Sequence, residues 1–175
     1  MAVTTRRMTA DEFLALPPER YTQLIDGVVI VGEPRLRHQR IVGLIHGLFF
    51  MWARARPGQG EPGIGCNYKI DDRNVFVPDV WFFLEANRPG DVLFVDGVPD
   101  LVVEVRSPST WRFDIGRKKG GYRQRGVKEL WLVDTKADQV LVTRGDEEFA
   151  VGRGEGLTTP LLPGLTIDVT ELFDR

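Results

Sequence analysis

Two acidic residues and a lysine stand out in this chain because of where they fall. Asp79 follows Pro78 at the entrance to an apolar run, Glu104 interrupts the run Leu101 to Val105, and Lys118 lies in the polar segment that comes next. Two carboxylates that converge can hold Mg²⁺, which needs only one or two protein carboxylates and keeps several waters. A metal of this kind makes a bound water more acidic, and a lysine can stabilise the negative charge that develops during attack. The set therefore indicates metal-dependent hydrolysis of a phosphodiester.

Glu104 needs an explanation of its own, because side chains alternate along a strand and this one shares its face with Val102. Burying a glutamate among valines and leucines is unfavourable unless the carboxylate is paired or bound to a metal. The alternative to a metal is an ion pair with Arg106 or Arg112. For Asp79, the alternative is a residue at a strand entrance that accepts hydrogen bonds from local backbone amides.

Asp114, Lys118 and Tyr122 follow each other at intervals of four residues, so they share one face of a helix. Asp114 near the start of this helix would favour the helix dipole and could pair with Lys118. Structural and functional roles fit Asp114 equally well, whereas packing is the more common role for a residue such as Tyr122.

Four segments have strand composition: Ile64 to Ile70, Phe76 to Leu84, Leu101 to Val105 and Leu130 to Val133. The last three are almost entirely apolar, which is typical of central strands covered on both faces. A helix from about Arg112 to Arg125, ended by Gly126, joins the last two strands and predicts a parallel, right-handed crossover.

The remaining elements surround this centre. We expect a short helix opened by the capping box Thr9 to Glu12, a hairpin turning at Asp26-Gly27, an amphipathic helix from Arg37 to Ala55, loops at 57–65 and 85–99, a peripheral hairpin of Val140 to Thr143 with Glu148 to Gly152, and a short helix at Val169 to Phe173. The prediction is one domain, residues 1–175, with an α/β fold whose mixed central sheet is flanked by helices.

Composition sets the broad class. A chain of 175 residues with 42% apolar and 27% charged residues is typical of one folded domain. No apolar run is long enough to cross a bilayer, and Met1 to Arg7 contains no apolar leader segment. The single cysteine, Cys66, excludes an internal disulfide and predicts an inert core thiol in a reducing compartment. We expect a cytoplasmic protein without a membrane partner.

The charge is distributed unevenly, although the net charge is only −2. Seven basic residues and one acid, Asp114, lie between Arg112 and Lys128. Such a segment could contact phosphates, but charge alone favours a solvated helix face. The two histidines, His38 and His46, show no zinc-binding spacing, and the chain contains no phosphate loop, nucleophile elbow or dinucleotide fingerprint.

Several short segments, taken in order, resemble one known family. They are residues 8–13 (MTADEF), 24–27 (LIDG), 37–42 (RHQRIV), Pro78-Asp79, 99–105 (PDLVVEV), 107–110 (SPST), Lys118, Tyr122 and 161–165 (LLPGL). Over nearly its whole length the chain is similar to the Uma-type restriction endonucleases, a family in the restriction-endonuclease-like PD-(D/E)XK superfamily.

The resemblance implies an α/β/α nuclease core that uses Mg²⁺ or Mn²⁺. It assigns Asp79 and Glu104 as metal-binding acids, with the backbone carbonyl of Val105 as a third ligand. The usual lysine position, two residues after the glutamate, holds Arg106, and the family takes its lysine from the following helix, at Lys118. Members carry glutamate immediately before the Leu-Ile-Asp-Gly turn, whereas this chain has Gln23, which brings no charge and cannot act as a base.

Three hypotheses follow. The first is a Mg²⁺- or Mn²⁺-dependent endonuclease acting on DNA, in which Asp79 and Glu104 hold the metal, Lys118 assists attack and Gln23 orients water. Asp114 and Tyr122 would support this site, and the residues expected to contact the DNA are Arg35, Arg37, His38, Arg40, Arg112, Arg117, Lys119 and Arg123. The second is a degenerate nuclease fold that binds nucleic acid or a protein without cleavage, because Gln23 removes a charge. The third is a small-molecule phosphohydrolase. Apolar edge strands between Val140 and Val151 could support a homodimer.

Overall fold

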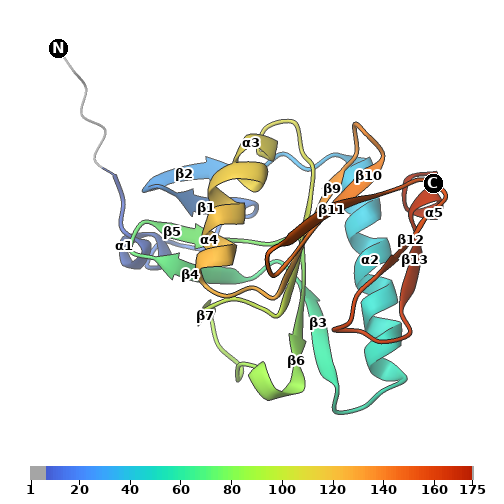
Figure 1. Cartoon of the computed structure of the whole chain (residues 1–175). Helices are drawn as coiled ribbons and strands as arrows, with labels where there is room; N and C mark the ends of the chain where they lie inside the picture. Colours follow the sequence, from blue (N-terminus) through green and yellow to red (C-terminus); the bar gives the residue numbers. More distant parts are fainter. Residues whose placement is uncertain (1–6, 175) are drawn as a thin grey trace.

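The structure is a computed structural model that describes residues 7–174 (Figure 1). Nearly all of the segment 1–7, where no leader was expected, lies outside the described residues. The helices are α1 (Ala10–Leu14), α2 (Leu36–Arg54), α3 (Trp111–Phe113), α4 (Lys119–Gln124) and α5 (Val169–Phe173), with a 3₁₀ turn at Glu85–Asn87 and a π-helical turn at Asp114–Lys118. Among these residues no helix is both long enough and apolar enough to cross a membrane.

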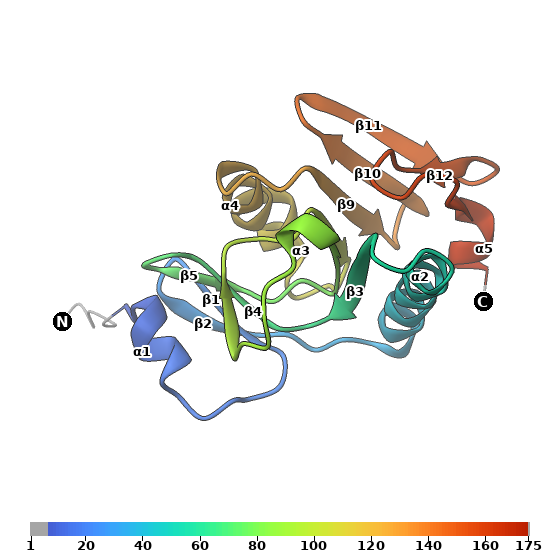
Figure 2. The same cartoon turned by 90° about the horizontal axis from the view of Figure 1, so that it is seen from below.

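A six-stranded sheet forms the centre of the molecule. Its order is β11 (Glu147–Gly152), β10 (Gln139–Arg144), β9 (Glu129–Asp134), β8 (Leu101–Val105), β6 (Val80–Leu84) and β3 (Gly60–Ile64). Only β8 and β9 are parallel, joined through α3 and α4, and the remaining neighbours are antiparallel. Helix α2 covers one face of this sheet and α4 lies on the other (Figures 1 and 2). The expected α/β/α core with a mixed sheet is therefore confirmed.

A second sheet packs on the α4 side. Its order is β2 (Val28–Val31), β1 (Thr22–Ile25), β5 (Asn74–Phe76), β4 (Asn67–Asp71) and β7 (Phe94–Asp96). The hairpin between β1 and β2 turns at Asp26 and Gly27, which both have positive φ, as the sequence predicts for a primed two-residue turn. The single mixed sheet that the sequence predicts is thus two sheets, with a small pair of strands, β12 (Gly156–Thr158) and β13 (Thr166–Asp168), beside them.

Alternation along β8 divides the core. Leu101, Val103 and Val105 join the cluster under α2, where Phe49 lies 5.5 Å from the Trp131 ring, measured between centroids. Val102 joins the cluster on the opposite face, together with Tyr122 of α4. Glu104 therefore points to the same side as α4, as the alternation predicts, and is only 3% exposed.

Two predicted strands are wrong because each is broken at a turn. Ile64 to Ile70 divides at Gly65 and Cys66, which both have positive φ, and the two parts enter different sheets. Phe76 to Leu84 divides at Pro78-Asp79 in the same way. The predicted loop at 57–65 contains β3, which tolerates Pro62 because β3 is an edge strand. Cys66 is exposed, so the predicted core thiol is also wrong.

The helical segment after β8 is predicted correctly in extent but not in detail. It runs from Trp111 to Gln124 and ends before Gly126, whose φ is +87°, but it contains the π-helical turn Asp114–Lys118. The peripheral hairpin of β10 and β11 is present, although β10 pairs with β9 as well, so the free edge belongs to β11 alone. The predicted connection at 85–99 contains the 3₁₀ turn and β7.

Candidate active site at the junction of the two sheets

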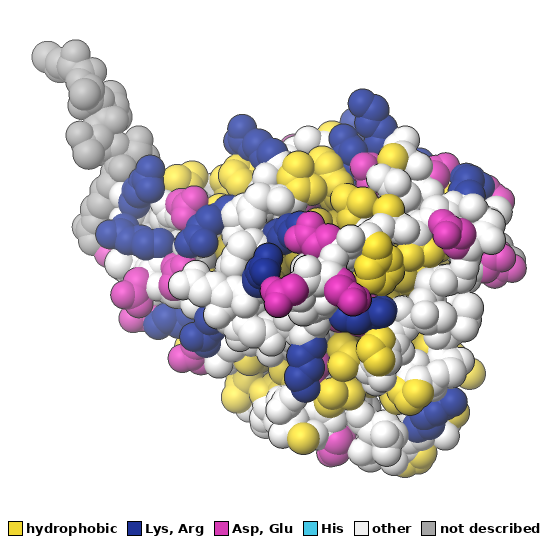
Figure 3. Space-filling view, viewed as in Figure 1, with side chains coloured by type: hydrophobic (Ala, Val, Ile, Leu, Met, Phe, Trp, Pro, Cys, Tyr) yellow, Lys and Arg dark blue, Asp and Glu magenta, His cyan; other side chains and the backbone are white. Residues whose placement is uncertain are grey.

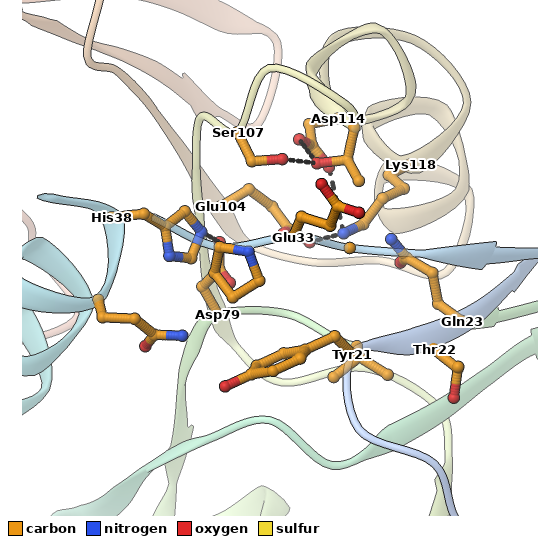
Figure 4. A pocket seen from close by; sticks show the side chains of 15 residues that line it. Tyr21, Thr22, Gln23, Glu33, His38, Asp79, Glu104, Ser107, Asp114 and Lys118 are labelled. Carbon is orange, nitrogen blue, oxygen red and sulfur yellow. Dashed lines mark hydrogen bonds and ion pairs between the residues drawn. The ribbon is translucent and has the colours of Figure 1, made fainter. Parts of the chain in front are cut away.

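The residues predicted to do chemistry line one pocket where the two sheets meet (Figure 4). Asp79 stands in the break between β5 and β6, and Glu104 is the penultimate residue of β8. Gln23 comes from β1 and Lys118 from the end of the π-helical turn. Chain breaks that disrupt the predicted strands thus bring side chains from both sheets to one place.

Lys118 is buried between two carboxylates. Its Nζ lies 2.7 Å from Oε1 of Glu104 and 3.2 Å from Oδ1 of Asp114, and all three side chains are at most 3% exposed. The Tyr122 hydroxyl donates a hydrogen bond of 2.6 Å to the same oxygen of Glu104. The alternative partner for Glu104, Arg106, instead pairs with Asp134 at 2.7 Å. The three residues spaced by four on the helix therefore do share one face, and that face meets Glu104.

The cluster contains more acidic than basic side chains, because Glu104, Asp114 and Asp79 all act on the single ammonium of Lys118. Burial raises the pKa of Glu104 to about 8; Lys118 opposes this rise, and the charges of Asp114 and Asp79 add to it. Burial also raises the pKa of Asp114. Burial acts to lower the pKa of Lys118, but the charges of Glu104 and Asp114 outweigh it, so the pKa is raised and the amine stays protonated. A proton or another cation is needed to balance the remaining negative charge.

A chain of hydroxyl groups extends the cluster. Thr110 donates to Oδ2 of Asp114 at 3.3 Å, and the Thr110 and Ser107 hydroxyl oxygens lie 2.8 Å apart. These bonds fix the carboxylate of Asp114, which in turn fixes the position of the Lys118 ammonium. Helix geometry alone would not predict this chain of hydroxyl groups, because Ser107 and Thr110 precede the helix.

Asp79 is held from two sides. Its Oδ2 accepts a hydrogen bond of 2.7 Å from the backbone N–H of Val105 and lies 3.2 Å from Nε2 of His38. Burial acts to lower the pKa of His38, but the hydrogen bond and the charge of Asp79 outweigh it and raise this pKa above 6.5. His38 is 8% exposed, so it forms a wall of the pocket and is not part of an open basic surface. Sequence reasoning missed the pairing of His38 with Asp79.

Two further side chains reach the pocket from β1 and from the segment after β2. Gln23 is 7% exposed and its Oε1 has no hydrogen-bond partner among the described residues. Glu33, which the sequence did not single out, lines the pocket and points toward its interior (Figure 4). An unpaired amide oxygen and a carboxylate in the pocket are both groups that can coordinate a cation or accept a hydrogen bond from water.

The donor set fits a hard divalent cation. It consists of the carboxylates of Asp79 and Glu104 and the free amide oxygen of Gln23, with the backbone of Val105 adjacent to Asp79. Among residues 7–174 no three His, Cys, Asp or Glu side chains converge as a ready cage. Mg²⁺ does not require one, because water and substrate oxygens complete its octahedron. The fit of this donor set to a divalent cation rests on the buried Gln23 Oε1, which has no partner among the described residues.

The predicted basic surface is largely neutralised by acids distant in sequence. Arg117 pairs with Asp26 and Asp71, and Lys119 pairs with Glu148. The same holds for the rest of the segment, in which Arg123 pairs with Asp146, Arg125 with Asp96 and Lys128 with Asp100. Arg37 pairs with Asp138, while Arg112 lies over the Phe113 ring. Basic and acidic side chains are accordingly interspersed on the face shown in Figure 3. Arg35 and Arg40 have no carboxylate within 4.0 Å among the described residues.

The fold has α/β/α layers, and the acids Asp79 and Glu104 lie at the ends of the central strands β6 and β8. This arrangement agrees with the restriction-endonuclease-like core that the resemblance implied. Residues 10–170 match the family described as "Uma2: Putative restriction endonuclease", and the chain belongs to this family. The family description places the chain among nucleases.

A solved structure supports the fold. A protein of Anabaena variabilis ATCC 29413, described as a "putative nuclease belonging to DUF820", superposes with a TM-score of 0.86 at 20% sequence identity, over 95% of this chain and 97% of the other. At this identity the likeness shows a shared fold. No curated protein matches the chain.

Proposed function

We propose that the chain is a Mg²⁺- or Mn²⁺-dependent endonuclease that hydrolyses phosphodiester bonds in DNA. The observation that carries this proposal is one pocket lined by Asp79, Glu104 and Gln23, with the buried ammonium of Lys118 in its wall. Family membership supports nucleic acid as the substrate class.

Each residue has a distinct role in this proposal. Asp79, Glu104 and the Gln23 amide oxygen would hold the cation, with the Val105 carbonyl as a further ligand. When bound, such a cation acidifies a water and neutralises charge on the phosphate. Lys118 is fixed by Glu104 and Asp114, so its ammonium needs no reorganisation to stabilise the negative charge that develops on the phosphate oxygens.

The supporting residues keep these groups in place. His38 and the Val105 amide occupy one oxygen of Asp79, which leaves the other oxygen for the cation. Tyr122 donates to Glu104 and stays protonated, because burial and then the charge of Glu104 raise its pKa well above 10. Asp114 orients Lys118 through an ion pair of 3.2 Å between residues four apart in the same helical segment.

For the DNA contacts, we propose Arg35 and Arg40 together with Arg37, Arg112, Arg117, Lys119 and Arg123. Arg35 is exposed and directly follows Pro34, which lines the pocket. Arg37, Arg117, Lys119 and Arg123 hold ion pairs near the surface, which contribute little free energy and can be exchanged for phosphate contacts. Arg112 lies over the Phe113 ring. For a homodimer, which would suit cleavage of both strands, we propose the free edge of β11, where Phe149 is 39% exposed.

The test is cleavage of supercoiled plasmid with Mg²⁺ or Mn²⁺ by the wild type and by Asp79→Asn and Glu104→Gln. The proposal predicts metal-dependent cleavage that both substitutions reduce by at least about 100-fold. Glu129→Gln is a matched control, because Glu129 is 1% exposed and is hydrogen-bonded to Trp131, Arg144 and Thr159 on the far side of β9. Cleavage that persists in both site variants would refute the assignment, and an equal loss of cleavage in Glu129→Gln would show that the loss comes from a general folding defect.

A second candidate is a nuclease fold that binds DNA without cleaving it. The amide of Gln23 favours this candidate, since it leaves the pocket with one negative charge fewer than the family pattern. It predicts salt-sensitive DNA binding in the wild type with no metal-dependent turnover. Cleavage gained by Gln23→Glu in an otherwise inactive protein would decide in its favour.

A further inference from the structure

Tyr21 is an exposed aromatic residue inside the candidate active site. It directly precedes β1, lines the same pocket as Asp79 and Glu104, and is 53% exposed. In Figure 4 its ring extends from the start of β1 toward the part of the pocket that holds Asp79 and His38. Among the described residues that line this pocket, Tyr21 is the only one with a phenyl ring. None of the roles proposed above for the hydrolysis uses this ring.

The backbone of Tyr21 adopts a conformation that bulky residues normally avoid. Its φ is +60°, in the left-handed region, where the Cβ of an aromatic residue makes the backbone unfavourable. The Tyr21 carbonyl accepts a hydrogen bond of 2.8 Å from the N–H of Gly32, and the neighbouring Thr22 hydroxyl donates to the Glu19 carbonyl at 2.8 Å. These bonds hold the residue in place from both sides. Strained residues persist where the surrounding structure fixes them, and they are concentrated at active sites and ligand-binding sites.

No polar or aromatic contact within the fold explains this arrangement. Neither the ring nor the hydroxyl of Tyr21 has a hydrogen-bond, stacking or cation–π partner among residues 7–174. Two other exposed rings do have such partners, because Phe50 stacks on His46 with centroids 6.3 Å apart and Phe149 lies under the guanidinium of Arg144. An exposed ring without a partner, held inside a pocket by a strained backbone, is available to a ligand.

The groups beside Tyr21 indicate which part of a substrate would lie on its ring. Glu33 directly follows Gly32, lines the pocket and has no ion pair or hydrogen bond among the described residues. A free carboxylate at this position disfavours a phosphate next to Tyr21, whereas it can accept a hydrogen bond from the amino group of a base. The face of a tyrosine ring stacks on flat rings of this kind. A nucleobase therefore fits this part of the pocket better than a phosphate does.

We propose that Tyr21 stacks on an unstacked nucleobase of the DNA strand whose phosphate lies at Asp79 and Glu104, and so positions that strand for hydrolysis. Tyr21 precedes Gln23 by two residues, so their Cα atoms are at most about 7 Å apart. The base of a nucleotide whose phosphate lies beside Gln23 can span such a distance. The identity of the ligand rests on the proposed function, while the exposure and the strain of Tyr21 are independent of it.

The test measures DNA binding without cleavage. Fluorescence anisotropy in the presence of a chelator compares a short labelled single strand with its abasic counterpart, which has the same phosphates and no bases. Tyr21→Asn removes the ring and should weaken binding of the base-bearing strand about 5-fold to 100-fold, the range typical of stacking one base on an aromatic side chain. The same substitution should leave binding of the abasic strand unchanged. Tyr21→Phe keeps the ring and should bind both strands as the wild type does.

Tyr21→Asn also separates a binding role from a structural one. Asparagine tolerates a positive φ better than tyrosine does, so the variant should melt at the wild-type temperature or above it. Phe149→Leu, on the exposed edge of β11, is the matched aromatic control and should bind both strands as the wild type does. The proposal is overturned if Tyr21→Asn binds the base-bearing strand as tightly as the wild type, or if it weakens binding of both strands equally. It is also overturned if Tyr21→Phe loses as much affinity as Tyr21→Asn, because the hydroxyl and not the ring would then hold the strand.

Failure here differs from failure of the proposed function. A wild type that cleaves DNA in a metal-dependent manner, but whose binding of the base-bearing strand does not depend on the ring of Tyr21, overturns the stacking role alone. A wild type whose binding of the base-bearing strand depends on this ring, but which never cleaves, supports the stacking role and removes the endonuclease proposal.

Discussion

Replacing Lys118 by methionine removes the only buried ammonium that the described residues place between Glu104 and Asp114. The side chain keeps most of its length, so the change isolates charge from packing. Removing one partner of a buried ion pair typically destabilises a protein by about 3–5 kcal/mol, because the other charge is left uncompensated. For a chain of this size, that loss lowers the melting temperature by roughly 6–20 °C.

The pH dependence of this loss has a definite sign. In the wild type, burial already raises the pKa values of Glu104 and Asp114 above those of the unfolded chain. Without the ammonium of Lys118, both pKa values stay raised in the folded state. The folded variant then binds protons that the unfolded chain has released, so the contribution of these two groups to its stability is fully present at low pH and is lost as the pH rises. The cost of the substitution should accordingly shrink at roughly pH 5.

Thermal and urea unfolding of the metal-free protein provide the assay, at pH 5 and pH 8. Lys119→Met is the matched control, because the neighbouring Lys119 is 26% exposed and pairs with the exposed Glu148. It should change the free energy of unfolding by less than about 1 kcal/mol. The buried ion pair does not stabilise the fold as described if Lys118→Met is as stable as Lys119→Met at pH 8. The same conclusion follows if the loss in free energy of unfolding caused by Lys118→Met grows as the pH is lowered.

Three further predictions concern the pocket and its helix. Gln23→Glu should tighten Mn²⁺ binding about tenfold or more in a calorimetric titration, since it adds a carboxylate where an amide oxygen has no partner; unchanged affinity would mean that residue 23 does not reach the cation. The apparent affinity of the wild type for Mn²⁺ should rise between pH 6 and pH 9, because the raised pKa of Glu104, about 8, means that the metal must displace a proton; a flat profile would contradict this. Gly121→Ala should destabilise the protein by about 1–3 kcal/mol, as its Cβ would meet Phe76 at 2.7 Å. In contrast, Gly120→Ala, with nothing within 4 Å, should be neutral or stabilising by up to about 1 kcal/mol in the same unfolding assay.

The sequence predicts well those parts of the molecule in which one local signal decides the outcome. A glutamate inside an apolar strand identified Glu104 as a buried acid, and a four-residue spacing placed Asp114, Lys118 and Tyr122 on one face. The Asp26-Gly27 turn and the amphipathic pattern of α2 were likewise sufficient. Each of these signals lies within a few residues of the feature it predicts.

The features that sequence reasoning missed depend on residues far apart in the chain. Pro78 argues against a continuous central strand through residues 76–84, but nothing local shows that the parts before and after it enter different sheets. His38 meets Asp79 only through the packing of α2 against the central sheet. The basic segment after β8 could contact phosphates, although its charge alone favoured a solvated helix face. Its pairing with acids such as Asp71 and Glu148 was not predicted, because these acids reach it only in the folded molecule.

The central claim is that the pocket at the junction of the two sheets holds a divalent cation. Calorimetric titration of Mn²⁺ into the wild type and into the double variant Asp79→Asn/Glu104→Gln tests it most directly, with Glu129→Gln as the buried-acid control. We expect saturable binding to the wild type and the control, and none to the double variant. Identical isotherms for the wild type and the double variant would contradict it.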